Sequence, residues 1–213
     1  MIETIKENLE SKLPGIHSWN RMTVKPVNDF NIVNEKIIKY EELLSEKKLN
    51  NMKQAAVLIC LFKKNGDYHL PLIRRPMHEK NHPGQIALPG GAREENEALE
   101  NTALREAFEE VGIIPDSVDI IGKMTPLPVP VSKYLITPFI GITENEPKWN
   151  INEKEVDELI ILKFKDLIDS DDGYYEDWNL NSHMLRVPIF KVMNKDIWGA
   201  TAAVLSELVD LSR

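Results

Sequence analysis

The sequence predicts a layered α/β protein in which strands and helices alternate along the chain. Residues 55–62, AAVLICLF, are a continuous apolar run with β-branched members, which is typical of a buried strand. Residues 97–111 carry apolar side chains at helical spacing, and Gly112 follows them as a helix C-cap. Further strand patterns and a final helix pattern come after this helix. Such an interleaved order favours helices packed on a sheet.

The individual elements follow from local patterns. A helix is expected over residues 2–13, because apolar side chains recur near helical spacing and Pro14 stops the helix. Asn65-Gly66 is a hairpin turn signal that joins residues 55–62 to a returning strand. The other expected elements are, in chain order, a helix around 35–49, a strand over 68–75, an ordered loop over 76–91 with a short strand at 85–88, strands near 119–123, 135–142 and 159–163, a loop over 171–183, and a helix over 198–211.

The length of the chain indicates one large domain or one domain with terminal additions. It has 213 residues, and the sequence shows no linker long enough to separate two domains. We expect residues 1–50 to form a helical extension packed on a main domain of residues 51–213. This extension either caps the domain or supports a homodimer.

The composition excludes several classes of protein. Apolar residues make up 42% and charged residues 28%, as in ordinary globular proteins. The one cysteine, Cys60, excludes an internal disulfide and fits a reducing compartment. No apolar run approaches the roughly 20 residues that a membrane span needs, and residues 1–13 lack the apolar region of a signal peptide. We therefore expect a cytoplasmic protein with no membrane partner.

The charge of the chain is acidic. The formal net charge is -8, from 26 basic and 34 acidic residues. Broad binding of nucleic acid is unfavourable for such a chain, and we expect no nucleic-acid partner. Local binding of phosphates or divalent cations stays open, so the positions of the acidic residues decide the interpretation.

Three glutamates gather on the predicted helix of residues 97–111. Glu106, Glu109 and Glu110 stand at i, i+3 and i+4, so at about 100° per residue they share one sector of the helix. Their mutual repulsion and their place near the C-terminal end of the helix dipole both disfavour the cluster. A bound hard divalent cation would compensate for both effects. A solvated acidic face is the alternative interpretation.

The same segment resembles the Nudix box, written G-x5-E-x7-R-E-U-x-E-E-x-G-U with U aliphatic. The one departure is Ala107, which is small where a bulky aliphatic residue is usual. The positions that match in register are Gly91, Glu97, Arg105, Glu106, Glu109, Glu110, Gly112 and Ile113. So many fixed positions make the match far more specific than a lone glycine motif.

This resemblance implies an α+β protein with the Nudix fold, an α/β/α sandwich around a central mixed sheet. It implies hydrolysis of a nucleoside diphosphate derivative with Mg²⁺ or Mn²⁺ as cofactor. The implied metal ligands are Glu106, Glu109, Glu110 and the carbonyl of Gly90. The implied catalytic residues are Glu109, Arg105 and Glu155, and Glu97 and Gly112 are implied to be structural positions of the box.

The general base is open between a box glutamate and a glutamate of a later loop. Glu153, Glu155 and Glu158 are the local candidates in the later segment. Glu155-Val156 before an apolar strand resembles the late acidic site of the family, so Glu155 is favoured among these glutamates. Ordinary surface charge before a strand is the alternative interpretation.

The substrate is indicated by residues upstream of the box. PLIRRPMHEKNHPGQIALPGG, residues 71–91, resembles the signature of the coenzyme A pyrophosphatase branch, and Lys80 stands where that signature has arginine. The residues assigned to substrate binding are Arg74, Arg75, Lys80 and Gly91. Coenzyme A or a derivative, cleaved to phosphopantetheine and adenosine 3′,5′-bisphosphate, is the expected substrate.

Two classes of alternative stay open at this point. Another Nudix substrate, such as ADP-ribose, NADH or a dinucleoside polyphosphate, would leave the site unchanged. A nucleotide-sensing Nudix domain would bind without cleaving, although such domains often lose acidic residues of the box. In each case the expected partner is a small nucleotide.

Overall fold

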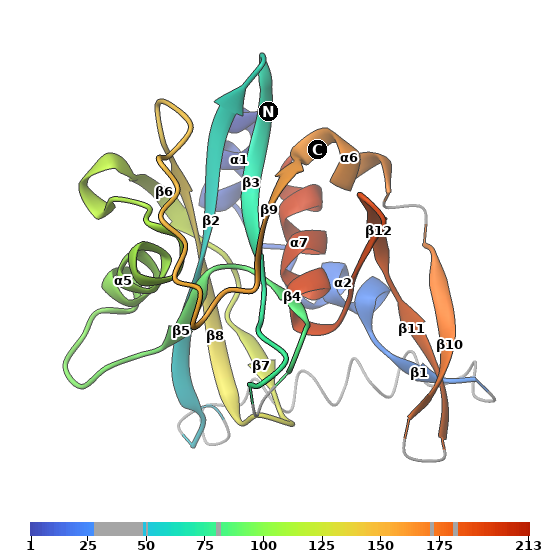
Figure 1. Ribbon diagram of the computed structural model, residues 1–213. Helices are drawn as coiled ribbons and strands as arrows, with labels where there is room; N and C mark the ends of the chain where they lie inside the picture. The colour runs from blue at the N-terminus through green and yellow to red at the C-terminus, as the bar shows by residue number, and fades with distance from the viewer. Residues whose placement is uncertain (28–48, 50, 80–81, 171–172, 181–182) are drawn as a thin grey trace.

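A computed structural model describes residues 1–27, 49, 51–79, 82–170, 173–180 and 183–213 (Figure 1). The helix expected around residues 35–49 and the substrate-binding residue Lys80 lie outside the described residues, apart from the last position of that helix.

The centre of the fold is a mixed sheet built around one long strand. β2 (Lys53–Lys64) pairs along one edge with β8 in parallel, and its other edge is shared by β5 at its start and β3 at its end, both antiparallel. The other strands of this sheet are β3 (Asp67–Arg74), β4 (Ile86–Ala87), β5 (Gly90–Ala92), β6 (Asp119–Lys123), β7 (Leu127–Val129), β8 (Tyr134–Ile142) and β9 (Glu158–Lys163). The hairpin turn between β2 and β3 is confirmed, because Asn65 and Gly66 both have positive φ.

Helices cover both faces of the sheet (Figure 1). α5 (Leu99–Val111) packs on one face over Leu58 and Cys60, and α7 (Gly199–Leu211) packs on the other over Ile59 and Leu61. Successive side chains of a strand point to opposite faces, so β2 is apolar from residue 55 to residue 62 because both its faces are covered there. The expected α/β/α sandwich around a mixed sheet is therefore confirmed.

The N-terminal residues pack against α7. α1 (Ile2–Glu10), α2 (Ile16–Trp19) and the 3₁₀ helix η1 (Asn20–Met22) place Ile5 and Trp19 in the same core as α7. α1 ends earlier than residue 13, because the backbone and side chain of Ser11 both donate hydrogen bonds to the carbonyl of Asn8. The division of the chain at residue 50 stays a prediction.

A buried carboxylate joins these segments to α7. Glu207 is fully buried, and its Oε1 accepts hydrogen bonds from the Gly15 amide at 3.1 Å and the Thr125 hydroxyl at 2.6 Å. Its Oε2 accepts from Trp19 Nε1 at 3.2 Å. Burial raises the pKa of Glu207, and these hydrogen bonds partly offset that effect. Glu207 thus links three segments that are distant in sequence.

The expectation of a loop over residues 171–183 is wrong for the described part of that range. β10 (Tyr175–Leu180) and β11 (His183–Pro188) form a hairpin that continues to β1 (Lys25–Pro26). Arg186 lies 4.2 Å from the ring centre of Tyr175 and pairs with Asp177 at 2.8 Å. Polar cross-strand pairs hold this hairpin, so the apolar alternation that marks a strand in sequence is missing.

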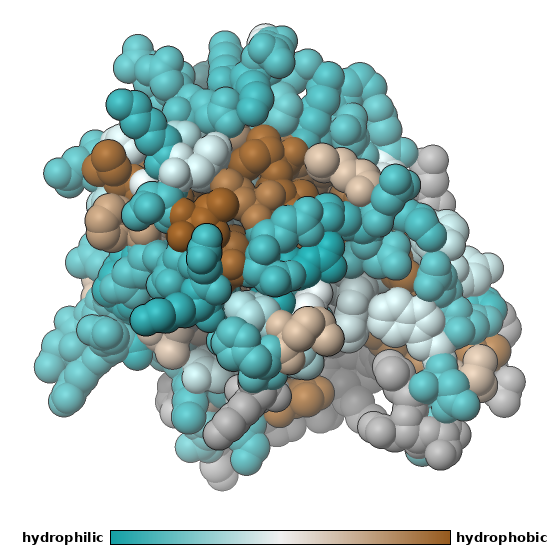
Figure 2. All heavy atoms as spheres, viewed as in Figure 1, coloured by the Kyte–Doolittle hydropathy of each residue, from teal (hydrophilic) through white to brown (hydrophobic). Residues whose placement is uncertain are grey.

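Three further short elements were not expected. α6 (Phe164–Asp169) follows β9, and β12 (Phe190–Val192) pairs with β13 (Lys195–Ile197) before α7. No helix in the described ranges combines the length and the apolar character that a bilayer span requires. Figure 2 shows a face covered mostly by hydrophilic side chains, with its largest hydrophobic area near the centre.

We expect Glu207→Leu to lower the free energy of unfolding by about 3 kcal/mol, because buried donors of Gly15, Trp19 and Thr125 lose their acceptor. Urea unfolding at neutral pH measures the change. Glu3→Ala is the control, since the Glu3 side chain is 82% exposed and its loss should change stability by less than about 0.5 kcal/mol. Equal unfolding midpoints for the two variants would contradict the prediction.

Candidate active site

The backbone of β5 lies against the carboxylates of α5. The Gly90 amide donates a hydrogen bond to Oε2 of Glu110 at 2.9 Å. A Cβ atom on Gly91 would lie 2.5 Å from the carboxylate of Glu106, and one on Gly90 would lie 2.3 Å from the carbonyl oxygen of Ala56. Gly90 also has a φ of +153°, which disfavours other residues. Both glycines are thus needed for β5 to lie this close to α5 and β2.

Arg105 binds several acidic residues of the box at once. Its Nε donates to Glu97 Oε1 at 2.9 Å, and its Nη1 donates to Glu106 Oε1 at 2.9 Å and Glu109 Oε2 at 3.1 Å. Its Nη2 donates to the carbonyl of Ala92 at 3.2 Å. The hydrogen bonds to Glu97 are the main cause of the raised pKa of Arg105, and those from Arg105 lower the pKa of Glu97 to about 2. Arg105 therefore orients the box carboxylates while staying charged.

Glu106 and Glu110 are carboxylates in a poorly solvated place. Glu110 is 4% exposed, and burial raises its pKa to about 8 against the opposing hydrogen bond from Gly90. Burial also raises the pKa of Glu106, and the hydrogen bond from Arg105 partly offsets the effect. A divalent cation would compensate for the cost of keeping both groups ionised.

The donor set fits a hard divalent cation. Glu106, Glu109 and Glu110 offer carboxylate oxygens, and the adjacent Gly90 offers a carbonyl oxygen. Glu106 and Glu109 point to Arg105 in this structure. Within the described part of the chain, no three or more His, Cys, Asp or Glu side chains are arranged so that they could hold a metal ion together. The chemistry of the donors fits the metal, although the side chains are held by protein partners.

The C-terminal end of α5 is closed by glycine and by a later loop. Gly112 adopts the left-handed conformation with a φ of 80°, and its amide donates to the Phe108 carbonyl at 2.9 Å, which confirms the predicted C-cap. The amides of Asn150 and Asn152 donate to the carbonyls of Val111 and Glu110, each at 3.0 Å. The loop that carries Glu153 and Glu155 is thereby docked on the box helix.

The three candidates for the general base occupy different surroundings. Glu155 lies close enough for its charge to raise the pKa of Glu106 and Glu110. Glu158 lies in β9 and accepts hydrogen bonds from Arg74 at 2.8 Å and Lys195 at 2.7 Å. Glu153 is exposed to solvent. Glu155 therefore lies on the loop that is docked on the box helix, and Glu158 lies in an ion-pair cluster.

Arg74 and Arg75 lie on opposite sides of the sheet. Leu72 belongs to the core under α7 and Ile73 to the core under α5, so alternation places Arg74 on the α7 side and Arg75 on the α5 side. The positive charge of Arg75 opposes the rise in the pKa of Glu110. The two arginines assigned to substrate binding thus lie on different sides of the sheet.

The surroundings of Arg75 differ from those of Arg74. Arg75 Nη2 donates to Glu79 at 3.1 Å, and its buried Nε–H has no hydrogen-bond partner among the described residues. Arg74 shares the carboxylate of Glu158 with Lys195, a residue that sequence reasoning missed. Lys195 lies in a short hairpin outside every sequence motif, so no pattern in the sequence predicts its contact with Glu158.

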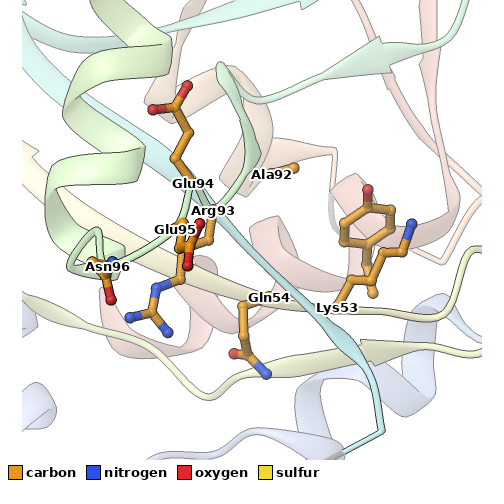
Figure 3. A pocket seen from close by; sticks show the side chains of 8 residues that line it. Lys53, Gln54, Ala92, Arg93, Glu94, Glu95 and Asn96 are labelled. Carbon is orange, nitrogen blue, oxygen red and sulfur yellow. The ribbon is translucent and has the colours of Figure 1, made fainter.

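Two surface hollows lie beside the box. One, of about 530 Å³, is bounded by the box loop Ala92–Asn96 and by Lys53, Gln54 and Tyr134 (Figure 3). The other, of about 670 Å³, lies between the start of α5 and strands β6 and β8, and shares Gln54 with the first. Neither is lined by Glu106, Glu109 or Glu110, so the carboxylate cluster rather than a deep pocket marks the candidate site.

Comparison with known proteins places these features in one family. The family model described as "NUDIX domain" matches residues 52–182. The chain therefore belongs to the Nudix hydrolase family, an enzyme class that hydrolyses nucleoside diphosphate derivatives. Nudix hydrolases act on small nucleotide substrates and generally use divalent metal ions.

The relatives agree with this assignment. "Uncharacterized Nudix hydrolase NudL" of Enterobacter sp. (strain 638) is 35% identical over 159 residues, which are 74% of this chain and 82% of the relative. "Nudix hydrolase 15, mitochondrial" of Arabidopsis thaliana is 34% identical over 163 residues, covering 72% of this chain and 56% of that protein. The crystal structure of RenU, a Nudix hydrolase from M. smegmatis, has a TM-score of 0.51 at 18% identity over 76% of this chain and 86% of its own, which supports the fold.

The lowered pKa of Glu97 leads to a prediction about acid stability. In the folded protein its pKa falls from 4.5 to about 2, so its contribution to stability is complete above about pH 4.5 and is lost as the pH falls toward 2. Glu97→Gln should lower the melting temperature at pH 7 and should lose less stability than wild type between pH 5 and pH 3. Melting curves at these pH values provide the test, with the exposed Glu95→Gln as the control. Parallel pH profiles for wild type and Glu97→Gln would refute the assigned role.

Proposed function

We propose that this Nudix hydrolase cleaves the diphosphate bond of coenzyme A or a coenzyme A derivative, giving phosphopantetheine and adenosine 3′,5′-bisphosphate. The observation that carries the proposal is the upstream signature, in which Arg75 lies on the same side of the sheet as Glu110. A guanidinium beside the metal-binding carboxylates is suited to bind a diphosphate.

The cofactor in this proposal is Mg²⁺ or Mn²⁺, held by Glu106, Glu109, Glu110 and the Gly90 carbonyl. When bound, such an ion screens the phosphate charges and makes an attacking water more acidic. Arg105 keeps Glu106 and Glu109 oriented between turnovers through its two Nη1 hydrogen bonds. The buried position of Glu110 supports its role, because a carboxylate with little solvent gains most from a cation.

Proton transfer from water is assigned to Glu155, with Glu109 as the alternative base. Glu155 is exposed and close to the box carboxylates, so it can face both solvent and the bound diphosphate. Arg105 contributes to catalysis by holding the box in place, and Glu97 and Gly112 support the box loop and the helix end.

The substrate side of the proposal rests on four residues. Arg75 would bind the diphosphate directly, because its buried Nε–H has no acceptor among the described side chains and backbone groups. Gly91 would let phosphate approach β5. Arg74 is assigned from the basic segment of the sequence, and it pairs with Glu158 on the other side of the sheet. Lys80 lies outside the described residues and is supported by the sequence signature alone.

The location and organisation are proposed on separate grounds. A cytoplasmic location is supported by Cys60, because a chain with this one cysteine cannot form an internal disulfide. Burial also raises the pKa of the Cys60 thiol to about 12. The packing of Ile5 and Trp19 in the core supports residues 1–50 as a cap on the domain of residues 51–213, in preference to a homodimer arm.

We expect Glu109→Gln and Glu110→Gln each to lower kcat at least about 100-fold with little change in melting temperature. Glutamine resembles the protonated form of Glu110, which the metal-free protein favours near neutral pH, so the fold should persist. Initial rates and Mn²⁺ binding by calorimetry measure the effect. Glu100→Gln, at an exposed position of the same helix, is the control. Full activity in both Glu109→Gln and Glu110→Gln would remove the metal assignment.

For the substrate, we expect kcat/KM for coenzyme A to exceed that for ADP-ribose, NADH and dinucleoside polyphosphates by tenfold or more, because the signature around Arg75 belongs to the coenzyme A branch. Product analysis with Mg²⁺ and with Mn²⁺ supplies the rates. Faster hydrolysis of another compound would replace coenzyme A but keep the family. Binding of every compound without hydrolysis would favour a nucleotide-sensing domain.

A further inference from the structure

The loop between β8 and β9 is fastened to the end of the box helix. The last carbonyls of a helix lack partners within the helix. Here the amide of Asn150 donates to the Val111 carbonyl and the amide of Asn152 donates to the Glu110 carbonyl, each at 3.0 Å. The backbone of a proposed metal ligand is therefore in direct contact with this loop.

Asn152 also forms the turn that precedes Glu155. Its carbonyl accepts hydrogen bonds from the amides of Glu155 and Val156, each at 2.9 Å. Its side-chain Oδ1 accepts from the amide of Lys154 at 3.2 Å, which closes an Asx-type turn. One residue thus contacts Glu110 through its amide and determines the path of the chain to Glu155 through its two oxygens.

The other side of Glu155 is anchored separately. Val156 is 2% exposed, and the amide of Asp157 donates to the Arg74 carbonyl at 2.9 Å. The side chain of Glu155 itself is exposed, and its carboxylate accepts no hydrogen bond from the described residues. Its direction is consequently set by the backbone on either side, and on the N-terminal side this backbone is the turn at Asn152.

We propose that Asn152 is a positioning residue, whose side chain holds the turn that carries Glu155 on the loop docked against Glu110. This proposal rests on the proposed role of Glu155 as the base. The backbone hydrogen bond from Asn152 to Glu110 does not depend on the side chain. Simple capping of α5 therefore predicts no effect of an alanine substitution, whereas positioning of Glu155 predicts a loss of rate.

The test compares Asn152→Ala with Asn150→Ala, because both residues donate a backbone hydrogen bond to α5 and only Asn152 adds the side-chain turn. We expect Asn152→Ala to lower kcat about ten- to a hundredfold, the scale of a small misplacement, with KM changed less than about twofold. Amide hydrogen exchange at Lys154 should become faster. Asn150→Ala should keep both the rate and the exchange of wild type. Asn152→Asp retains the acceptor and should restore part of the rate.

A second comparison separates this proposal from the proposed function. If Asn152 acts through Glu155, then Asn152→Ala should lower the rate no further in a Glu155→Gln background. Equal losses in both backgrounds, or an Asn152→Ala rate equal to wild type while Glu155→Gln is impaired, would overturn the role of Asn152 and leave the base in place. A wild-type rate for Glu155→Gln would overturn the base, and the positioning role with it.

Discussion

The site depends on the guanidinium of Arg105. Three glutamates in the last two turns of α5 repel one another and oppose the helix dipole, which would weaken the helix. Arg105 binds Glu106 and Glu109 on the helix and Glu97 on the preceding loop, so one positive charge compensates locally for several negative ones. Its further hydrogen bond to the Ala92 carbonyl fixes the loop to the helix. The acidic cluster can thus persist in a fold that would otherwise disfavour it.

Most of the box and the sandwich could be predicted from sequence because they rest on local patterns. The apolar run that became β2, the Asn65-Gly66 turn and the helix closed by Gly112 each follow from the properties of adjacent residues. The sequence signature treats consecutive residues as one motif, so it does not indicate that Arg74 and Arg75 lie on opposite sides of the sheet. A strand sends neighbours to opposite faces, and this rule separates them once β3 extends to Arg74.

The remaining features depend on contacts between distant residues or on polar pairs. The acceptor role of Glu207 needs Gly15, Trp19 and Thr125, and no spacing along the chain links these residues. The β10–β11 hairpin is held by pairs such as Asp177–Arg186, which have the composition of a loop. Hydrophobic periodicity reports burial, so it cannot detect strands that remain exposed or a carboxylate that is buried with polar partners.

The edge of β2 that β5 and β3 share affects how the enzyme loses its structure when heated. β5 exists only as a short ladder on residues Ala55–Val57, and the same β5 residues Gly90 and Gly91 contact the carboxylates of Glu110 and Glu106. The box carboxylates of the candidate active site are therefore attached to the central sheet of the domain. Loss of the box geometry on heating should then coincide with global unfolding of the domain.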